Sequence, residues 1–293
     1  GPLRWRRQEQ DTRIDVGWLQ AQNPHARGQA AAVVRLAPGR VPELSLLASI
    51  TDGVAREAHR HIPLRKLPEP VANWLSNAFV SGQAKRGVIM HEGPIRIDPS
   101  RQQDRTLQVG IKARNLTLNF LPDWPNVTQL SAEVVIDGRE IRGRRVSGRI
   151  FNSRLDQVTV DIPEYEGDEA PVLIINSRLQ GPAADVQALL QSTPLAKALP
   201  DELQLWAMRA GTVRGHALLN IPLRADAGDM AVLVQADAQG ITLENSQRRL
   251  ALSEVQGAVS FSLDQGIQAP ALTAKLWQQP LLASVRSEDR KTR

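Results

Sequence analysis

The strongest constraint on the fold of this chain is an alternation of apolar and polar residues with a period of two. Leu107 and Val109, for example, alternate with Gln108 and Gly110. This period places the apolar side chains on one face of a strand and the polar ones on the other. The same alternation recurs over residues 30–36, 44–50, 213–223, 230–236 and 255–263. The chain is therefore predicted to be mainly β, with antiparallel strands that form sheets with one covered face.

Two stretches depart from the alternation and predict short helices. Residues 68–78 carry Val71, Trp74 and Leu75 at helical spacing, and residues 182–190 show a similar pattern. Each begins at a proline, which the first turn of a helix tolerates because its missing N–H has no partner there. A further helical turn is predicted over residues 200–206. These helices are too short to cover the apolar faces of about a dozen strands.

An internal repeat links the two halves of the chain. Several residues recur in the same order 128 positions later. The segment from Pro63 to Trp74 recurs 131 to 132 positions later, from Pro194 to Trp206, so the second copy lacks about four residues between its Trp and its Arg-Gly pair. The recurring residues are Gly53, Arg86, Gly87, Pro94 and Arg96, which match Gly181, Arg214, Gly215, Pro222 and Arg224. No Gly/Ser-rich linker separates the copies, so the pattern favours an extended sheet of repeated units over a closed domain.

The 293 residues divide into repeats rather than independent domains. We expect residues 4–60 to end a preceding repeat, residues 61–181 and 182–285 to form one repeat each, and residues 286–293 to be a polar tail. Residues 1–3 have the sequence of an expression-tag remnant. No apolar run approaches the roughly 18–20 residues of a membrane span. We expect an interior piece of a longer chain, so this says nothing about an anchor elsewhere.

The charge pattern does not favour nucleic acid as a partner, although the net charge is +5. Six arginines between Arg139 and Arg154 lie beside five acids between Asp161 and Glu169. The favoured interpretation is a pair of solvated strand surfaces, and the alternative is a site for an anionic partner. Aromatic residues make up only 4% of the chain and do not interleave with the arginines, so a stacking platform for bases is not expected.

Signatures of catalysis and of metal binding are missing from the sequence. None of the motifs G-x-S-x-G, G-x-x-x-x-G-K-[ST], G-x-G-x-x-G and H-E-x-x-H occurs, and there is no cysteine. His59 and His61 could share a metal with Glu57 or Asp52, and the acids of residues 161–169 could bind calcium. Solvated polar loops explain both groups better, because neither has the ligand spacing of a known site. We predict no catalytic residue, no metal and no cofactor.

Two architectures satisfy the pattern of apolar faces. In one, two sheet faces pack on each other as an ordinary β-sandwich. In the other, an open, strongly curved sheet leaves a hydrophobic trough along its length, and such an exposed apolar surface needs a ligand or partner. Acyl chains would suit that trough, since each buried methylene contributes about 0.8 kcal/mol. Composition and periodicity leave both architectures open.

Several segments resemble one known family. The run LPEPVANWL at residues 67–75 resembles the central region of YhdP-type proteins, which are relatives of AsmA and TamB. Residues 115–125, which contain NLTL and LPDWP, resemble the same region, as do residues 178–185 and 193–197. The likeness extends from about Pro42 to Gln279, and the order and spacing of these segments are more specific than any one of them.

The resemblance implies a large envelope protein of Gram-negative bacteria, with one inner-membrane helix and a long periplasmic rod. The rod would be an elongated, strongly curved antiparallel sheet of repeated hydrophobic β-grooves with a few short α-helices, which favours the trough. The implied function is non-enzymatic phospholipid transport between the inner and outer membranes. Phospholipid and the two membranes would be its partners, together with possible envelope proteins, and nucleic acid would not.

The residues expected to line the groove come from the long alternations. They are Val109, Ile111, Val134, Ile136, Leu219, Ile221, Val232, Val234, Val259 and Phe261. A slip of one residue would invert every side chain of a strand. The main alternative function is a structural or scaffolding module that spans the envelope and binds proteins around a closed core. An enzyme that uses acids such as Asp161 and Glu164 is a third alternative.

Overall fold

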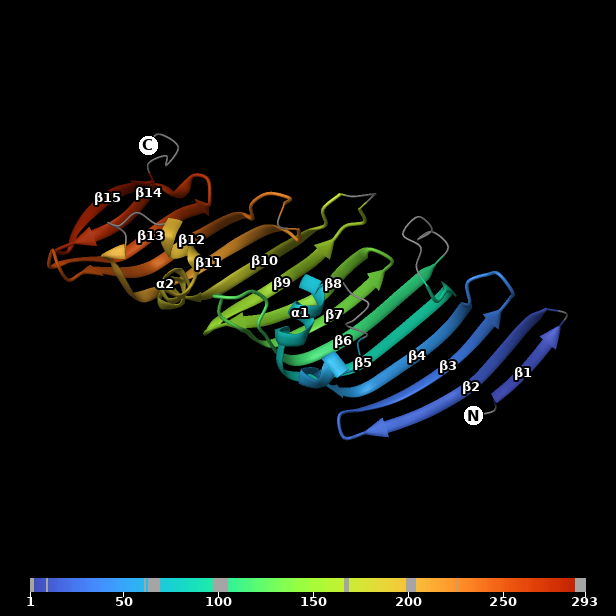
Figure 1. Ribbon diagram of the computed structural model, residues 1–293. Coiled ribbons are helices and arrows are strands. Elements are labelled where there is room, and N and C mark those ends of the chain that lie inside the picture. Colours follow the sequence, from blue (N-terminus) through green and yellow to red (C-terminus); the bar gives the residue numbers. More distant parts are fainter. Residues whose placement is uncertain are drawn as a thin grey trace. The chain divides into compact units, whose positions relative to one another are not determined.

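A computed structural model of the chain describes residues 3–8, 10–60, 62, 69–96, 105–165, 169–198, 204–224 and 226–287. The chain forms two compact units. The first comprises residues 1–116, 131–144 and 162–165, and the second comprises residues 117–130, 145–161 and 166–293. Figure 1 labels the helices and strands.

The described residues form fifteen strands that follow one another in the sheet in sequence order, with β1 and β15 at its edges. The strands are β1 (Leu3–Gln8), β2 (Asp11–Asn23), β3 (Ala26–Leu36), β4 (Glu43–Val54), β5 (Phe79–Pro94), β6 (Thr106–Leu118), β7 (Val127–Asp137), β8 (Glu140–Ile150), β9 (Ser153–Ile162), β10 (Val172–Pro182), β11 (Ala207–Pro222), β12 (Ala231–Asn245), β13 (Leu250–Ser262), β14 (Gly266–Leu276) and β15 (Gln279–Arg286). Within the units, β1–β5 and β9–β15 pair antiparallel with their neighbours. The predicted mainly β, antiparallel fold with few helices is confirmed.

Both predicted helices are present. They are α1 (Glu69–Ala78) and α2 (Ala183–Ser192). Two short 3₁₀ helices, η1 (Ala55–Arg60) and η4 (Pro194–Ala198), were not predicted, because one turn carries too few residues to show a period. The further turn predicted over residues 200–206 lies largely outside the described residues.

β5 and β11 are both 16 residues long, and their first residues, Phe79 and Ala207, are 128 positions apart. In the described part of each preceding connection, the first helix begins with a buried alanine, Ala55 or Ala183. These correspondences support the repeat read from the sequence, while the boundaries of the repeats remain a prediction.

Glycines allow neighbouring strands to approach closely near the start of β5 and of β11. Gly82 has φ +109°, and a Cβ there would lie 2.5 Å from the Asn115 carbonyl oxygen. Gly211 has φ +94°, and a Cβ there would lie 2.5 Å from the Ile241 Cα. The register of β11 with β12 shifts on either side of Ala210, beside Gly211. Such a bulge bends a strand and increases its twist.

The core of the second unit lies where α2 packs on the sheet (Figure 1). Ala183 of α2 is fully buried in a cluster with Val213, Ala238 and Ile241 from β11 and β12. Short side chains at Ala183 and Ala238 let the helix come close to the strands. This end of the sheet is therefore closed by its own helix.

A buried carboxylate holds α2 to the turn between β8 and β9. Asp185, which is 7% exposed, accepts hydrogen bonds from the Asn152 backbone N–H at 2.8 Å and from the Ser153 hydroxyl at 2.8 Å. The Asn152 side-chain amide donates a third bond at 3.2 Å. An unpaired buried charge is costly, so moving α2 away from these three donors would cost free energy. The hydrogen bonds therefore fix the position of α2 against the turn.

Candidate functional site

One face of strands β10–β13 is apolar, and the register defines it. Directly opposite residues in an antiparallel pair lie on the same face. Leu219 of β11 is opposite Val232 of β12, and Val234 of β12 is opposite Phe261 of β13. We call this surface the second apolar face; it consists of Leu173, Ile175, Leu219, Ile221, Val232, Val234, Val259 and Phe261. The structure thus brings together six of the ten residues predicted to line a groove.

The second apolar face is only partly covered. Val232 is 5% exposed, whereas Leu219, Ile221, Val234 and Phe261 are half-buried. All strands of the described residues belong to one sheet, so they provide no second sheet to close this face as a β-sandwich would. Away from α2, apolar side chains therefore remain accessible to a ligand.

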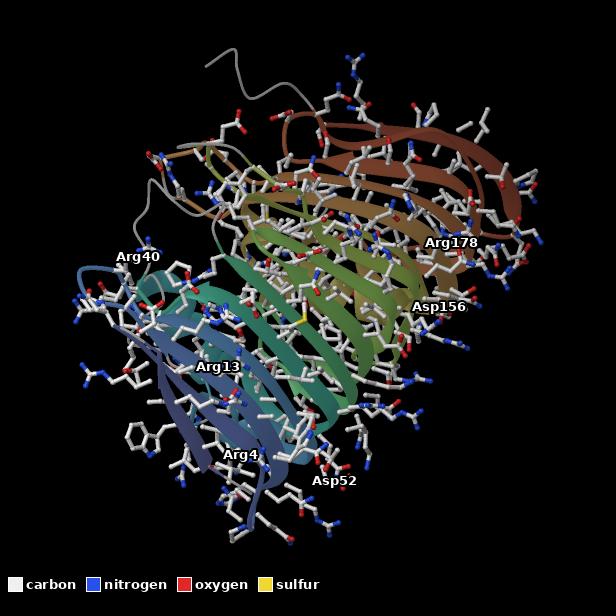
Figure 2. The ribbon with its side chains drawn as sticks, turned by 90° about the vertical axis from the view of Figure 1, so that its right-hand side faces the viewer. Arg4, Arg13, Arg40, Asp52, Asp156 and Arg178 are labelled. Atoms are coloured by element: carbon white, nitrogen blue, oxygen red, sulfur yellow. The ribbon has the colours of Figure 1, made fainter. Side chains whose placement is uncertain are left out.

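The opposite face of the same strands is polar. Arg214 lies opposite Asp237, and Gln235 lies opposite Ser260. Arg178 of β10 and Asp156 of β9 are cross-strand partners on this face, and Figure 2 labels both. A hollow of about 610 Å³ lies here. It is lined mainly by Arg178, Arg214, His216, Gln235, Asp237 and Ser260.

The His216 Nε2 atom lies 2.7 Å from the Asn176 side-chain oxygen beside this hollow. This face therefore carries hydrogen-bonding side chains that the second apolar face lacks, together with apolar ones such as Leu233.

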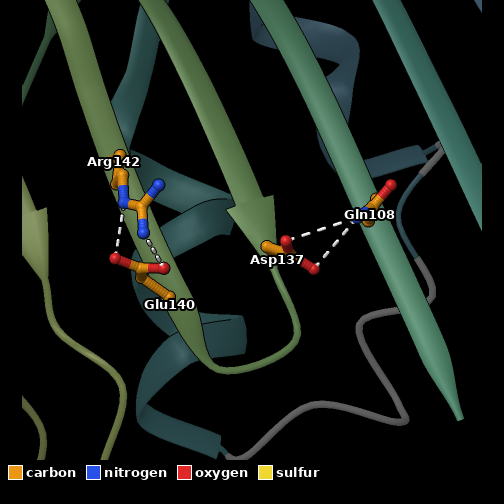
Figure 3. Close-up of polar contacts among 4 residues, drawn as sticks. All are labelled: Gln108, Asp137, Glu140 and Arg142. Atoms are coloured by element: carbon orange, nitrogen blue, oxygen red, sulfur yellow. Dashed lines mark hydrogen bonds and ion pairs between the residues drawn. The ribbon is translucent and has the colours of Figure 1, made fainter.

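Strands β6 and β7 also have one polar and one apolar face, and Figure 3 shows the contact between Gln108 and Asp137 on the polar face. The Gln108 amide donates to the Asp137 carboxylate at 3.2 and 3.3 Å, and Lys112 pairs with Glu133 at 2.8 Å. These cross-strand contacts place the four polar side chains on one face. The alternate residues lie on the other face and are half-buried; they are Val109, Ile111, Val134 and Ile136. All ten predicted groove residues therefore lie on apolar faces.

Strands β1–β5 of the first unit present an apolar face that the sequence indicated only in part. Ala32 of β3 is opposite Val16 of β2 and Leu46 of β4, and Leu46 is in turn opposite His91 of β5. We call this surface the first apolar face; it consists of Ile14, Val16, Ala32, Val34, Leu44, Leu46, Ile50, Ile89 and His91. The contribution of β2 was missed because a bulge after Val16 interrupts its alternation.

The YhdP protein family matches residues 1–293. The chain belongs to this family. It is also 28% identical over 247 residues to the intermembrane phospholipid transporter YhdP of Escherichia coli (strain K12), an alignment that covers 82% of the chain. The chain spans about 18% of the length of that relative. No solved structure matches it.

In the described part of the chain, no three side chains of His, Asp or Glu are grouped to hold a metal ion. His59 Nδ1 bonds to the Arg56 carbonyl oxygen at 2.9 Å, while His61 and residues 166–168 of the acidic segment lie outside the described residues. In the same part of the chain, no helix is long and apolar enough to cross a membrane.

Proposed function

We propose that this chain carries phospholipids without catalysing a reaction, with their acyl chains lying on its apolar faces. The observation that carries the proposal is the half-exposed second apolar face, which is backed by a polar face on the same strands. Each methylene that leaves water for such a surface contributes about 0.8 kcal/mol. A pair of acyl chains can therefore bind strongly without any specific polar contact.

The relative from Escherichia coli supports the same proposal, since it is named as an intermembrane phospholipid transporter. Because the chain spans about 18% of that protein, we propose that it is one segment of a longer periplasmic rod anchored in the inner membrane. In the complete protein, apolar faces like these would guide lipid between the inner and outer membranes. Envelope proteins that hold the rod in place would be further partners.

A structural role is the second candidate, and the closed core under α2 favours it. Ala183 is fully buried and Ile241 is 5% exposed, so this part of the sheet offers no room for lipid. If the remaining apolar surface were also covered in solution, the chain would be a rigid spacer that binds proteins. Phospholipid content distinguishes the two candidates directly.

The test compares two substitutions at neighbouring positions of β11. Ile221 lies on the second apolar face, opposite Leu173, and Asn220 lies on the polar face, opposite Ile174 and Ala231. A carboxylate at position 221 would have to share an apolar environment with acyl chains, which costs several kcal/mol. We therefore expect Ile221→Asp to reduce bound lipid at least tenfold and Asn220→Asp to leave it unchanged.

Bound lipid is measured by extracting the purified protein for mass spectrometry and by titrating it with a fluorescent phospholipid. Circular dichroism verifies that both variants are folded. Lipid-free protein that also fails to take up the probe would refute lipid carriage and favour the structural role. Equal lipid content in both folded variants would show that the acyl chains do not lie on this face.

A further inference from the structure

Helix α2 closes one end of the second apolar face. Ala183 of α2 is fully buried and packs with Val213, close to the end at which β11 begins. On β12 and β13 the packed cluster extends to Ala236 and Val259. The side chains beneath α2 are already in contact with protein, so an acyl chain cannot pass between the helix and the strands at this end of the face.

Hydrogen bonds to two separate elements hold α2 in this position. Asp185 accepts its three bonds from the turn between β8 and β9. The Met208 backbone N–H, at the start of β11, donates to the Gln187 side-chain oxygen at 2.6 Å. Displacing the helix would leave a buried carboxylate without its donors, which is costly. The closed end is therefore a fixed part of the second unit.

The opposite end of the same face is open and charged. Leu223 continues the alternation of Leu219 and is 42% exposed. Its backbone N–H donates to the Pro171 carbonyl oxygen at 2.9 Å, so it extends the ladder between β10 and β11. Directly after it, Arg224 pairs with the exposed Asp226 at 2.6 Å. The face thus runs from a closed apolar end to a solvated polar end.

The open part of the face is about as long as one acyl chain. Ala217, opposite Val234, lies just beyond the cluster, and Leu223 follows six residues later. Six residues of a strand span about 20 Å at roughly 3.3 Å each. The chains of one bilayer leaflet span about 15 Å, half of the hydrocarbon core. A chain that lay across the strands would instead place its headgroup over apolar side chains such as Phe261, which is unfavourable.

We propose that α2 is an acyl-chain stop, and that a phospholipid on the second apolar face points its chain ends at α2 and its headgroup at Leu223. This inference rests on the proposed function and adds to it the direction in which the lipid lies. The chain ends meet the closed apolar end at Ala217, and the headgroup reaches water beside Arg224. Each part of the lipid is then in the surroundings that cost it least free energy.

The test maps the bound lipid with three phosphatidylethanolamine analogues, which carry a diazirine in the headgroup, in the middle of one acyl chain or at the end of that chain. Each is bound to the purified protein and activated by light, and the labelled residues are found by mass spectrometry. Because the two ends of the open face lie about 20 Å apart, the chain-end analogue should label α2 and Ala217 roughly fivefold more than Leu223. The headgroup analogue should show the reverse preference, and the mid-chain analogue should label Leu219.

Two substitutions on β11 form a matched pair for the same test. Leu219→Asp puts a carboxylate beside the middle of the chains and should reduce binding of the fluorescent phospholipid by roughly tenfold. Leu223→Asp puts the same group beside the headgroup, where water solvates it, and should change binding by less than about twofold. Circular dichroism verifies that both variants are folded, and the labelling experiment uses the unsubstituted protein.

Three results would overturn the proposal. If the chain-end and headgroup analogues label α2 equally, or if their preferences are reversed, the orientation is wrong while lipid carriage stands. The same holds if Leu223→Asp loses as much binding as Leu219→Asp, because the chains would then extend to Leu223. If unlabelled phospholipid displaces none of the labelling, the proposed function fails together with the orientation.

Discussion

Replacing Gly211 with alanine should destabilise the second unit by about 3 kcal/mol. Gly211 has φ +94°, a conformation that costs an L-residue about 1–2 kcal/mol. Its new Cβ would also lie 2.5 Å from the Ile241 Cα and 2.6 Å from the Gly240 carbonyl oxygen. Both are backbone atoms, so a strand must move, and forced overpacking of this kind costs about 1–3 kcal/mol.

Gly228 supplies the matched control for that substitution. It has φ +100°, yet a Cβ there would meet nothing within 4 Å. Gly228→Ala therefore has only the conformational cost of the positive φ, and the lower entropy of the unfolded alanine chain offsets part of it. We expect its free energy of unfolding to fall by about 1 kcal/mol. The difference of about 2 kcal/mol between the two variants measures the cost of the steric clash that the close approach of β11 to β12 creates.

Urea unfolding followed by circular dichroism measures both free energies, and thermal unfolding should show a drop of about 2–4 °C per kcal/mol. Gly82→Ala should behave like Gly211→Ala, because a Cβ there would lie 2.5 Å from the Asn115 carbonyl oxygen. Equal losses for Gly211→Ala and Gly228→Ala would refute the reasoning, since the neighbouring strand would then contribute nothing.

Three further substitutions test other parts of the structure. Asp185→Asn should cost about 2–3 kcal/mol in urea unfolding, because the carboxylate accepts three hydrogen bonds that an amide cannot all accept; an unchanged midpoint would contradict the anchoring of α2. The pKa of His91 lies below its ordinary value of 6.5, so the unfolded chain binds this proton more readily and stability is lost as the pH falls below that value. His91→Gln should therefore narrow the difference in melting temperature between pH 7.5 and pH 5.5, and an unaltered difference would count against this assignment. Ile241→Ala should cost about 3 kcal/mol, because the side chain is 5% exposed in the core, whereas Leu233→Ala, at 43% exposed on the polar face, should cost well under 1 kcal/mol; similar losses would mean that the faces are misassigned.

Local patterns predicted much of this fold because they depend on covalent geometry. Val232 and Val234 lie on one face of β12 because successive side chains of any strand point to opposite sides. α1 and α2 were found for a similar reason, since several turns of helix repeat their spacing. The contribution of Val16 on β2 was missed because a bulge after it adds a residue that the period cannot anticipate.

The contacts that matter most for the candidate site join residues far apart in the sequence. Asp185 meets Asn152 and Ser153 across more than 30 residues, and no local pattern marks it as a buried acceptor. His91 is an ordinary strand residue in the sequence. Only the register shows that it lies opposite Leu46, on the first apolar face.

The sequence by itself determined that this chain forms strands with one apolar and one polar face, and its segments indicated the YhdP family. Only the tertiary structure decided which strands share a face, which part of it α2 closes, and where polar groups interrupt it. The physical reason is that the alternation of side chains is fixed within each strand. The strand register and the packing of α2 on the sheet depend instead on hydrogen bonds and contacts between distant segments. The sequence of any one segment does not determine these interactions.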